Sequence, residues 1–297
     1  MLNFSQITRD NMACVVPFFS YQTERICDLT PGCVFMWRSF FDTRYAIVED
    51  SLVLMHSLQD GTWAFTLPMG QGPVSPALNA VAEYARAKGM PLVFTCLTGS
   101  GMTLLETHFD GAFRCEQSPD WSDYLYRKED LVELKGKKYH GQRNHINRIA
   151  KEFGGHRYVP FAQDNLWKAQ AFMESYTAQA PEKSPLFELE ARMTVELLEN
   201  YFAMPLVGGY LEIAGELAAF AVGETIGDTL YVHVEKALRK YPGAYAAINQ
   251  AFAQANAGEN IAFINREEDL GDPGLRAAKE SYHPFFKVEK FLCEVMV

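Results

Sequence analysis

The sequence predicts a mixed α/β (α+β) fold made of two similar halves, each with a central sheet flanked by helices. In both halves an apolar strand is followed by a glycine-bearing loop, a helix, a glycine and a second apolar strand. Trp63 and Tyr231 occupy equivalent places, as do Val93 and Ile261, and each pair is 168 residues apart (231 − 63 and 261 − 93). An internal duplication explains this spacing, although any two β-loop-α-β units share the same order.

Strands and one clear helix are predicted in the first half. Ser75 and Pro76 suit the N-cap and first position of a helix that Gly89 ends. Its apolar residues recur at helical spacing. Runs of β-branched and aromatic residues predict extended segments at 34–40, 45–47, 52–55, 63–67 and 91–97.

The second half is predicted to repeat this plan after a long helix at 137–153. Pro242 suits the start of its central helix, and Gly258 suits the end. Strands are expected on either side of that helix, at 230–234 and 261–264, and a further helix at 273–282. A strand at 123–127 ends the first half, which gives predicted domains 1–130 and 131–297. The two prolines in 179–185 indicate an exposed loop.

Composition narrows the functional class. Hydrophobic residues make up 48% of the 297 residues, enough for a large core, and the net charge of −10 argues against general nucleic-acid binding. Because no run of 18 apolar residues and no signal-peptide pattern occurs, we expect a cytoplasmic protein without an integral membrane segment. The six cysteines lack metal-ligand spacing, so all are expected to be free thiols and no metal site is predicted.

The strand at 230–234 carries polar residues with a period of two. Alternation places Tyr231, His233 and Glu235 on one face. This pattern predicts that the face lines a cleft, with Glu235 suited to act as a base and Tyr231 as an acid. A solvated strand face with ordinary polar residues is the alternative.

Basic residues occur at two places where an anion would be received. Arg239 and Lys240 precede the helix that begins near Gly243, and free backbone N–H groups at a helix start favour phosphate. The helix at 137–153 with its preceding loop is rich in cations and could receive polyphosphate or the end of an RNA. A solvated helix that lacks acids explains the second feature equally well.

A run of charged residues follows the strand at 261–264. It reads Asn265-Arg266-Glu267-Glu268-Asp269-Leu270-Gly271, and Lys279 and Tyr282 come about ten residues later. Because sites in α/β folds are built at strand ends, these groups are candidates to orient an acceptor or a leaving group. A solvated turn and a structural ion-pair network are the alternatives.

These motifs together resemble a known family. The resemblance rests on Asp123-Tyr124-Leu125-Tyr126, on Leu134-Lys135-Gly136-Lys137-Lys138 with Arg143-Asn144 and Asn147, on His233-Val234-Glu235-Lys236-Ala237, on Tyr241-Pro242-Gly243-Ala244-Tyr245, on Ile248-Asn249, and on the charged run at 265–271 with Lys279 and Tyr282. The chain resembles the DUF2156 proteins, which are similar to the C-terminal domain of phosphatidylglycerol lysyltransferase. This resemblance implies two tandem GNAT-like acyltransferase domains, as in the Fem peptidyltransferases, with the active site in the second.

The resemblance also implies how the residues divide among roles. It implies that the donor substrate is acyl-CoA or aminoacyl-tRNA and that contact with tRNA is limited. The implied acceptor is an amine or hydroxyl of a small molecule, a peptide or a lipid-like compound. Tyr245 stands where the CoA-binding pattern has glycine or alanine. The predicted catalytic residues are Glu235 or Asp269 as the base and Tyr282 as the acid. The predicted cofactor-binding residues are Val234, Lys236, Arg239, Lys240, Tyr241, Gly243 and Ala244. The predicted substrate-binding residues are Tyr231, His233, Lys138, Arg143, Asn144, Asn265, Arg266 and Lys279.

Two functions follow from these observations. The first is an acyl- or aminoacyltransferase in which an amine or hydroxyl attacks a thioester or ester near Glu235, helped by positioning, one base and an oxyanion donor. The second is a non-catalytic ligand- or partner-binding module on a degenerate duplicated fold.

Overall fold

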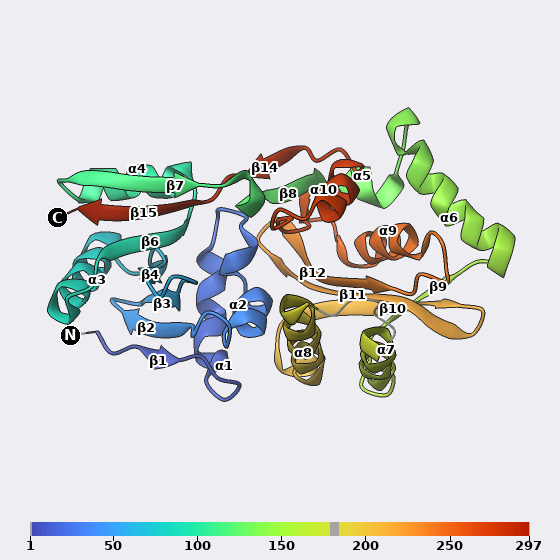
Figure 1. Ribbon diagram of the computed structural model, residues 1–297, viewed down its shortest axis with the longest axis horizontal. Helices are drawn as coiled ribbons and strands as arrows, with labels where there is room; N and C mark the ends of the chain where they lie inside the picture. Colours follow the sequence, from blue (N-terminus) through green and yellow to red (C-terminus); the bar gives the residue numbers. More distant parts are fainter. Residues whose placement is uncertain (1, 179–183, 297) are drawn as a thin grey trace. The chain divides into compact units, whose positions relative to one another are not determined.

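The computed structural model describes residues 2–178 and 184–296 (Figure 1). The chain forms two compact units. Unit 1 comprises residues 1–123, 268–272 and 287–297, and unit 2 comprises 124–267 and 273–286. The domain limits 1–130 and 131–297 stay a prediction. Most of the loop predicted at 179–185 lies outside the described residues.

Unit 1 is built on a mixed sheet. Within the described ranges its strands follow the order β1-β2-β3-β4-β6-β15-β7, and β5 pairs with β3. Among the residues that the structure describes, β4 and β6 are the one parallel pair of this sheet, through Phe65 and Phe94. The strands are β1 (Ser5–Gln6), β2 (Arg44–Val48), β3 (Ser51–Ser57), β4 (Trp63–Phe65), β5 (Met69–Gly70), β6 (Leu92–Leu97), β7 (Ala112–Gln117) and β15 (Phe291–Met296).

The helices of unit 1 are α1 (Met12–Val15), α2 (Pro31–Trp37), α3 (Val74–Lys88) and α4 (Gly99–His108). The extended segment predicted at 34–40 is wrong, because Thr30 caps α2 by accepting the Cys33 N–H at 3.3 Å and Pro31 occupies its first turn. α3 begins after Pro73 and not at the predicted Ser75 cap, while Gly89 ends it as expected with φ of 64°.

The sheet of unit 2 has the order β14-β8-β13-β12-β11-β10-β9 among the described residues. β12 and β13 run parallel to each other. The pairs β9–β10, β10–β11, β11–β12 and β8–β13 are antiparallel. The strands are β8 (Asp123–Arg127), β9 (Arg157–Pro160), β10 (Leu206–Ile213), β11 (Glu216–Ile226), β12 (Thr229–Ala237), β13 (Phe263–Asn265) and β14 (Phe286–Val288).

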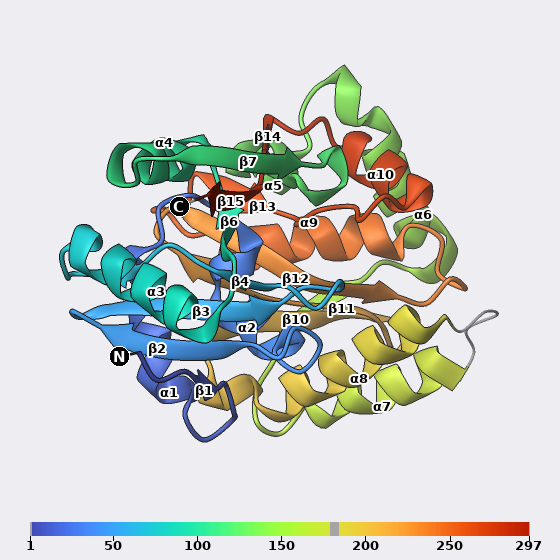
Figure 2. The ribbon, with the colours of Figure 1, turned by 60° about the vertical axis from the view of Figure 1, so that its left-hand side comes forward.

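Helices cover both faces of this second sheet (Figure 2). On one face α9 buries Ile248 and Phe252 in the main core of unit 2. On the other face α7 packs against β11, with the rings of Phe172 and Phe220 5.3 Å apart. The helices are α5 (Lys128–Glu133), α6 (His140–Phe153), α7 (Trp167–Ala178), α8 (Pro185–Glu199), α9 (Ala244–Asn256) and α10 (Pro273–Glu280).

The two sheets repeat one plan and exchange one strand each. In both, a parallel β-α-β unit is followed in space by an antiparallel strand that comes from elsewhere in the chain. β8, which ends the first half of the sequence, pairs with β13 in the second sheet. β15, which follows unit 2 in the sequence, pairs with β6 and β7 in the first.

A disulfide joins β15 to β7 within unit 1. Cys293 and Cys115 face each other across this antiparallel pair, and their sulfur atoms are bonded. The prediction that all cysteines are free thiols is therefore wrong for these two. Their 178-residue separation hid the pairing, which only the placement of β15 brings about. Cys14, Cys27, Cys33 and Cys96 form no disulfide within the described part of the chain.

Candidate functional site

A β-bulge in β12 places the polar residues of this strand. Val234 pairs with Val222, whereas Val232 pairs with the adjacent Gly223, so His233 is an extra residue. Directly opposed residues share a face, and the bulge therefore reverses the alternation after His233. The prediction that Tyr231, His233 and Glu235 share one face is wrong for this reason. A Cβ on Gly223 would lie 1.9 Å from the Tyr231 carbonyl oxygen, which explains the glycine.

His233 lies between two carboxylates inside unit 2. Its Nε2 is 2.8 Å from Glu224 Oε1, and its Nδ1 is 2.8 Å from Glu267 Oε1. Burial by itself lowers the pKa of His233, but hydrogen bonds and the charges of Glu224 and Glu267 outweigh it and raise the pKa to about 10. His233 is thus an imidazolium near neutral pH, with both ring nitrogens donating.

Glu235 lies on the α9 face of the sheet and pairs with Arg266. Glu235 Oε2 accepts from Arg266 Nη2 at 2.9 Å and from Asn249 Nδ2 of α9 at 3.4 Å. Glu235 Oε1 is buried and has no hydrogen-bond partner among the described residues. The same holds for Arg266 Nε and Nη1. The Glu235–Arg266 pair therefore has one buried acceptor atom and two buried donor atoms without a hydrogen bond. Such unsatisfied buried atoms are rare in native proteins and are a reason to suspect a functional site.

Two tyrosines flank the Arg266 guanidinium. Its central carbon lies 4.8 Å from the Tyr282 ring centre and 5.9 Å from that of Tyr126. Burial raises the pKa of Tyr282 to about 12 despite the opposing charge of Arg266. Tyr282 therefore keeps its proton at neutral pH and can donate it. Glu235, Arg266 and Tyr282, all predicted site residues, come together here.

The remaining predicted residues near β13 hold the backbone in place. Asn265 is fully buried, and its Oδ1 accepts from the Glu267 N–H at 2.6 Å. Lys279 of α10 is buried and donates to the Arg266 carbonyl at 2.5 Å. Tyr231 is also buried, and it pairs across the parallel strands with Asn265. These three groups fix the turn that carries Arg266 and Glu267.

The predicted anion loop before α9 is occupied by protein groups. Gly243 has φ of 100°, and a Cβ there would lie 2.2 Å from the His145 carbonyl oxygen, so this glycine admits the backbone of α6. Lys240 donates to Glu216 at 2.7 Å, and the Tyr241 hydroxyl donates to the same carboxylate at 2.9 Å. Arg239 is exposed.

The neighbouring predicted cofactor residues have structural contacts. Lys236 pairs with Glu190 of α8 at 2.7 Å. Val234 and Ala244 are buried in unit 2, and Ala244 opens α9 directly after Gly243. Their assignment to a cofactor stays a prediction.

The basic segment around α6 is partly neutralised. Lys138 lies 3.3 Å from Asp130, and Arg148 lies 2.6 Å from Glu152. Arg143 donates to the carbonyl oxygens of Leu134 and Gly136, which fixes the loop before the helix. Asn144 contacts His140 at 3.0 Å within α6. The three predicted substrate residues of this segment therefore have local partners.

Asp269 belongs to unit 1, whereas Glu235 and Tyr282 belong to unit 2. Its buried carboxylate accepts from the Gly271 N–H at 2.9 Å and so holds its own turn. Its predicted role as a base stays a prediction.

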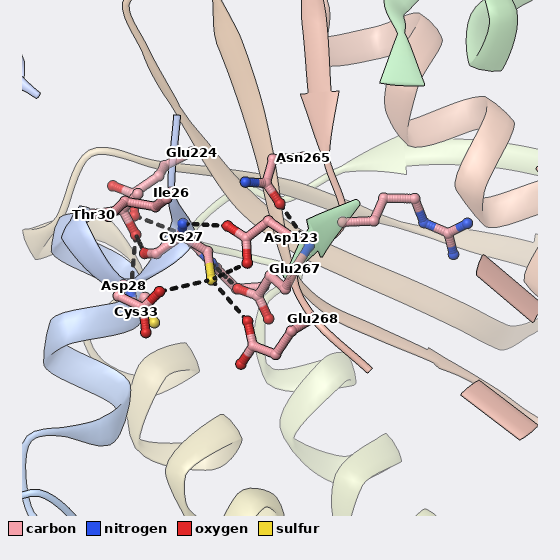
Figure 3. A network of polar contacts seen from close by, with 12 residues as sticks. Ile26, Cys27, Asp28, Thr30, Cys33, Asp123, Glu224, Asn265, Glu267 and Glu268 are labelled. Carbon is pink, nitrogen blue, oxygen red and sulfur yellow. Dashed lines mark hydrogen bonds and ion pairs between the residues drawn. The ribbon is translucent and has the colours of Figure 1, made fainter. Parts of the chain in front are cut away.

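A separate polar cluster lies in unit 1 (Figure 3). Cys27, Asp28, Asp123 and Glu268 place ligand-type atoms within 4.8 Å of one another. The Lys290 ammonium lies 2.6 Å from Asp28, 2.9 Å from Asp123 and 3.0 Å from Glu268. The nearby carboxylates raise the pKa of Lys290 well above its usual value although burial opposes them. The cluster thus already contains a cation.

Sequence reasoning missed Glu224, and it named Asn249 and Tyr126 within the motifs of the family resemblance without giving them a role. Glu224 is fully buried in β11, where it follows the apolar run at 217–223. A lone acid in such a strand was the available signal, because an unpaired buried carboxylate is costly. Asn249 similarly interrupts the apolar face of α9. Tyr126 was given no role, since buried tyrosines are common in strands.

The paired parallel units, with one strand exchanged into each sheet, define a tandem GNAT-like transferase fold. The chain belongs to the family described as phosphatidylglycerol lysyltransferase, C-terminal, whose model matches residues 21–294. No helix among residues 2–178 and 184–296 has the length and apolar character to cross a membrane.

Solved structures share the fold of this chain. A conserved protein of unknown function from Bacteroides thetaiotaomicron VPI-5482 is 31% identical, covers 100% of both chains and superposes with a TM-score of 0.88. L-PGS from Bacillus licheniformis is 16% identical over 98% of this chain and 93% of its own, with a TM-score of 0.69. FemX is 10% identical over 99% and 97%, with a TM-score of 0.61. The last two show the fold alone.

One curated relative also matches in sequence. It is the uncharacterized protein MYCGA3080 of Mycoplasmoides gallisepticum, 21% identical over 202 residues. The match spans 67% of this chain and 64% of that relative.

Proposed function

We propose that the chain is an aminoacyltransferase that moves an aminoacyl group from aminoacyl-tRNA to an amine or hydroxyl of a lipid or peptide acceptor. The family description, phosphatidylglycerol lysyltransferase, supports this class. The observation that carries it is the buried Glu235 carboxylate, whose Oε1 has no partner among the described residues beside Arg266 and Tyr282. Because this donor is cytoplasmic, the proposal implies a cytoplasmic site of action.

These three side chains can supply each part of the transfer. The acceptor amine or hydroxyl attacks the ester carbonyl of the donor as Glu235 Oε1 takes its proton. The free N–H groups of Arg266 stabilise the oxyanion of the tetrahedral intermediate. The ester C–O bond then breaks, and Tyr282 gives its proton to the departing ribose oxygen. The proton held by Glu235 restores Tyr282 through solvent, and no covalent enzyme intermediate is needed.

The loop before α9 supports aminoacyl-tRNA over acyl-CoA as the donor. A CoA pyrophosphate needs free backbone N–H groups and small residues at a helix start. Here the His145 backbone fills the space beside Gly243, and the half-exposed Tyr245 follows in the first turn. The exposed Lys137 and Lys151 leave a limited basic surface around α6 for RNA.

A transfer assay with separated acceptors tests the proposal. Purified protein is incubated with tRNA charged with a mixture of radiolabelled amino acids, together with phosphatidylglycerol vesicles or a lysine-containing peptide. We expect label in the lipid extract or on the peptide. Glu235→Gln should slow transfer by about 100-fold or more, because it removes the base.

Glu212→Gln is the matched control. Glu212 also lies on a strand of unit 2 and pairs with an arginine, Arg157 at 3.1 Å, but on the surface. It should keep the wild-type rate. Glu235→Gln leaves the buried Arg266 guanidinium without its carboxylate and should lower the melting temperature, so the rates are compared at a temperature where circular dichroism shows both variants folded. An unchanged rate in Glu235→Gln would rule out the mechanism. If the protein transfers acetyl groups from acetyl-CoA and does not use aminoacyl-tRNA, the donor is acyl-CoA. If it binds tRNA tightly without any transfer, the non-catalytic binding module is favoured.

A further inference from the structure

Unit 2 contains an aromatic cluster to which the transfer chemistry assigns no role. It comprises Phe172 and Tyr176 of α7, Phe187 of α8 and Tyr245 in the first turn of α9. The rings of Phe172 and Tyr176 are stacked with their centres 5.7 Å apart, and the Phe187 ring lies 6.2 Å from that of Tyr176. The hydroxyl oxygens of Tyr176 and Tyr245 are 3.5 Å apart. We call these four residues the aromatic platform.

The platform lies where the sheet of unit 2 is interrupted. Because α7 and α9 cover opposite faces of this sheet (Figure 2), Tyr176 and Tyr245 can meet only past a strand end or where neighbouring strands diverge. β12 provides such a place, since its register with β13 covers residues 229–231 in the described chain, whereas β12 itself continues to Ala237. The two tyrosines therefore meet beside the last part of β12, which also carries the proposed base.

The platform is about one helical turn from that base, Glu235. Tyr245 and Asn249 are four residues apart on α9, a rise of about 6 Å, and Asn249 donates to Glu235 at 3.4 Å. From the same stretch of β12, Lys236 Nζ lies 6.0 Å from the Tyr176 ring centre. Desolvation of its hydroxyl and the nearby Tyr176 raise the pKa of Tyr245, and the Glu235 carboxylate adds to this shift. Glu235 is thus close enough to act electrostatically on the platform.

Tyr245 presents its ring to solvent. It is 46% exposed, whereas Tyr176 and Phe187 are half-buried and support it from α7 and α8. An exposed aromatic ring held in one position is the usual means by which proteins bind an unpaired nucleobase. The proposed donor ends in an unpaired adenosine whose ribose carries the aminoacyl ester. One ribose therefore separates base from ester, a span similar to the helical turn between Tyr245 and the contact with Glu235.

We propose that the aromatic platform stacks the terminal adenine of the donor aminoacyl-tRNA and so positions its ester beside Glu235. This inference rests on the proposed function, and it names the part of the donor that unit 2 recognises. Coenzyme A also contains adenine, but a pantetheine arm and a pyrophosphate separate that base from the thioester. A base held one helical turn from Glu235 therefore suits an aminoacyl ester and does not suit the much longer CoA thioester.

Two RNA hairpins that differ in the terminal base test the platform. Both copy a tRNA acceptor stem with the 3′ end CCA, and one has an abasic ribose in place of the last adenosine. Dissociation constants are measured by fluorescence anisotropy at one salt concentration, because both hairpins share the salt-dependent phosphate contacts. The complete hairpin should bind about tenfold more tightly. Tyr245→Ala should abolish this preference, and Tyr245→Phe should keep it because the ring remains.

Trp167→Ala is the matched control. Trp167 is an aromatic residue of α7 that is 59% exposed and lies outside the platform. This variant should leave both dissociation constants unchanged. In the transfer assay, Tyr245→Ala should raise KM for aminoacyl-tRNA about tenfold and leave kcat within about twofold, because it removes binding and not chemistry. Circular dichroism checks that each variant is folded.

The outcomes separate this inference from the proposed function. Transfer from aminoacyl-tRNA by a protein that binds both hairpins equally, or a preference that persists in Tyr245→Ala, would overturn the platform alone. A preference that Tyr245→Ala removes would support the platform even if Glu235→Gln kept its transfer rate, which removes the mechanism. Absence of binding to either hairpin would refute both. Displacement of the complete hairpin by CoA would assign the adenine site to an acyl-CoA donor and refute the proposal.

Discussion

The two sheets share a strand order but differ in where they carry charge. Unit 1 has Trp63, Ala64 and Phe65 in β4, the strand that precedes its central helix α3. The corresponding strand of unit 2, β12, has His233 at a bulge and Glu235 beyond it. The comparison teaches that one fold can be repeated while a given strand carries ionisable groups in one copy and none in the other, as expected when function depends on the site and not on the fold.

The same contrast appears in two buried histidines. His56 of unit 1 has a hydroxyl beside Nδ1, and burial lowers its pKa to about 4. His233 of unit 2 is equally buried, yet two carboxylates raise its pKa to about 10. Burial favours the neutral ring in both, and only the carboxylates of Glu224 and Glu267 reverse the result.

The largest expected effect comes from removing one carboxylate of the charged histidine. Glu224→Gln leaves the His233 imidazolium with one partner inside unit 2. Breaking a buried ion pair in this way should lower the free energy of unfolding by about 3–5 kcal/mol, measured by urea denaturation. Glu212→Gln, on the adjacent strand and paired with the exposed Arg157, should change it by less than about 1 kcal/mol. Equal losses in the two variants would mean that His233 is not charged.

The two histidines should also differ in how their contributions to stability depend on pH. His56 has a folded pKa below its unfolded value of 6.5, so its contribution to stability is present above pH 6.5 and is lost as pH falls towards 4. His233 has a folded pKa above 6.5, so its contribution is present below pH 6.5 and is lost as pH rises through about 10. NMR titration of the two rings should give midpoints near these values. A His233 midpoint below 7 would contradict the assignment.

The smallest effect is expected at the exposed pair of Lys240 and Glu216. Both side chains are about half exposed, so solvent screens their 2.7 Å contact. Lys240→Ala should therefore cost no more than about 1 kcal/mol of unfolding free energy in urea denaturation. A loss above about 2 kcal/mol would show that Lys240 stabilises the loop before α9 more than a surface pair can.

Much of the fold could be predicted because local signals agree with it. Proline and glycine mark the ends of α3 and α9, and apolar runs mark β6 and β12. The strand predicted at 34–40 failed because its aromatic residues suggested β-structure, while Thr30 and Pro31 start a helix. The exchange of β8 and β15 depends on pairing between distant segments, which no local pattern contains.

Local sequence signals also indicated some residues of the candidate site and not others. Glu235, Arg266 and Tyr282 stand at element ends where polar groups are noticeable in a sequence. Their partner Asn249 lies within a helix, and Glu224 within an apolar strand. The face that Glu235 occupies follows from one extra residue at His233, and a period-two reading cannot detect a bulge. The catalytic role of Asp269 stays a prediction.

The exchanged strand β15 has a consequence for biosynthesis. Unit 1 requires β15 between β6 and β7, and the ribosome makes β15 only after it has made all of unit 2. The edges of β6 and β7 that pair with β15 therefore stay unpaired during translation while about 170 further residues are added. At ordinary elongation rates this takes roughly 10–30 s. The N-terminal unit of this protein is thus the last to be completed, and its nascent form is the state most in need of chaperone protection.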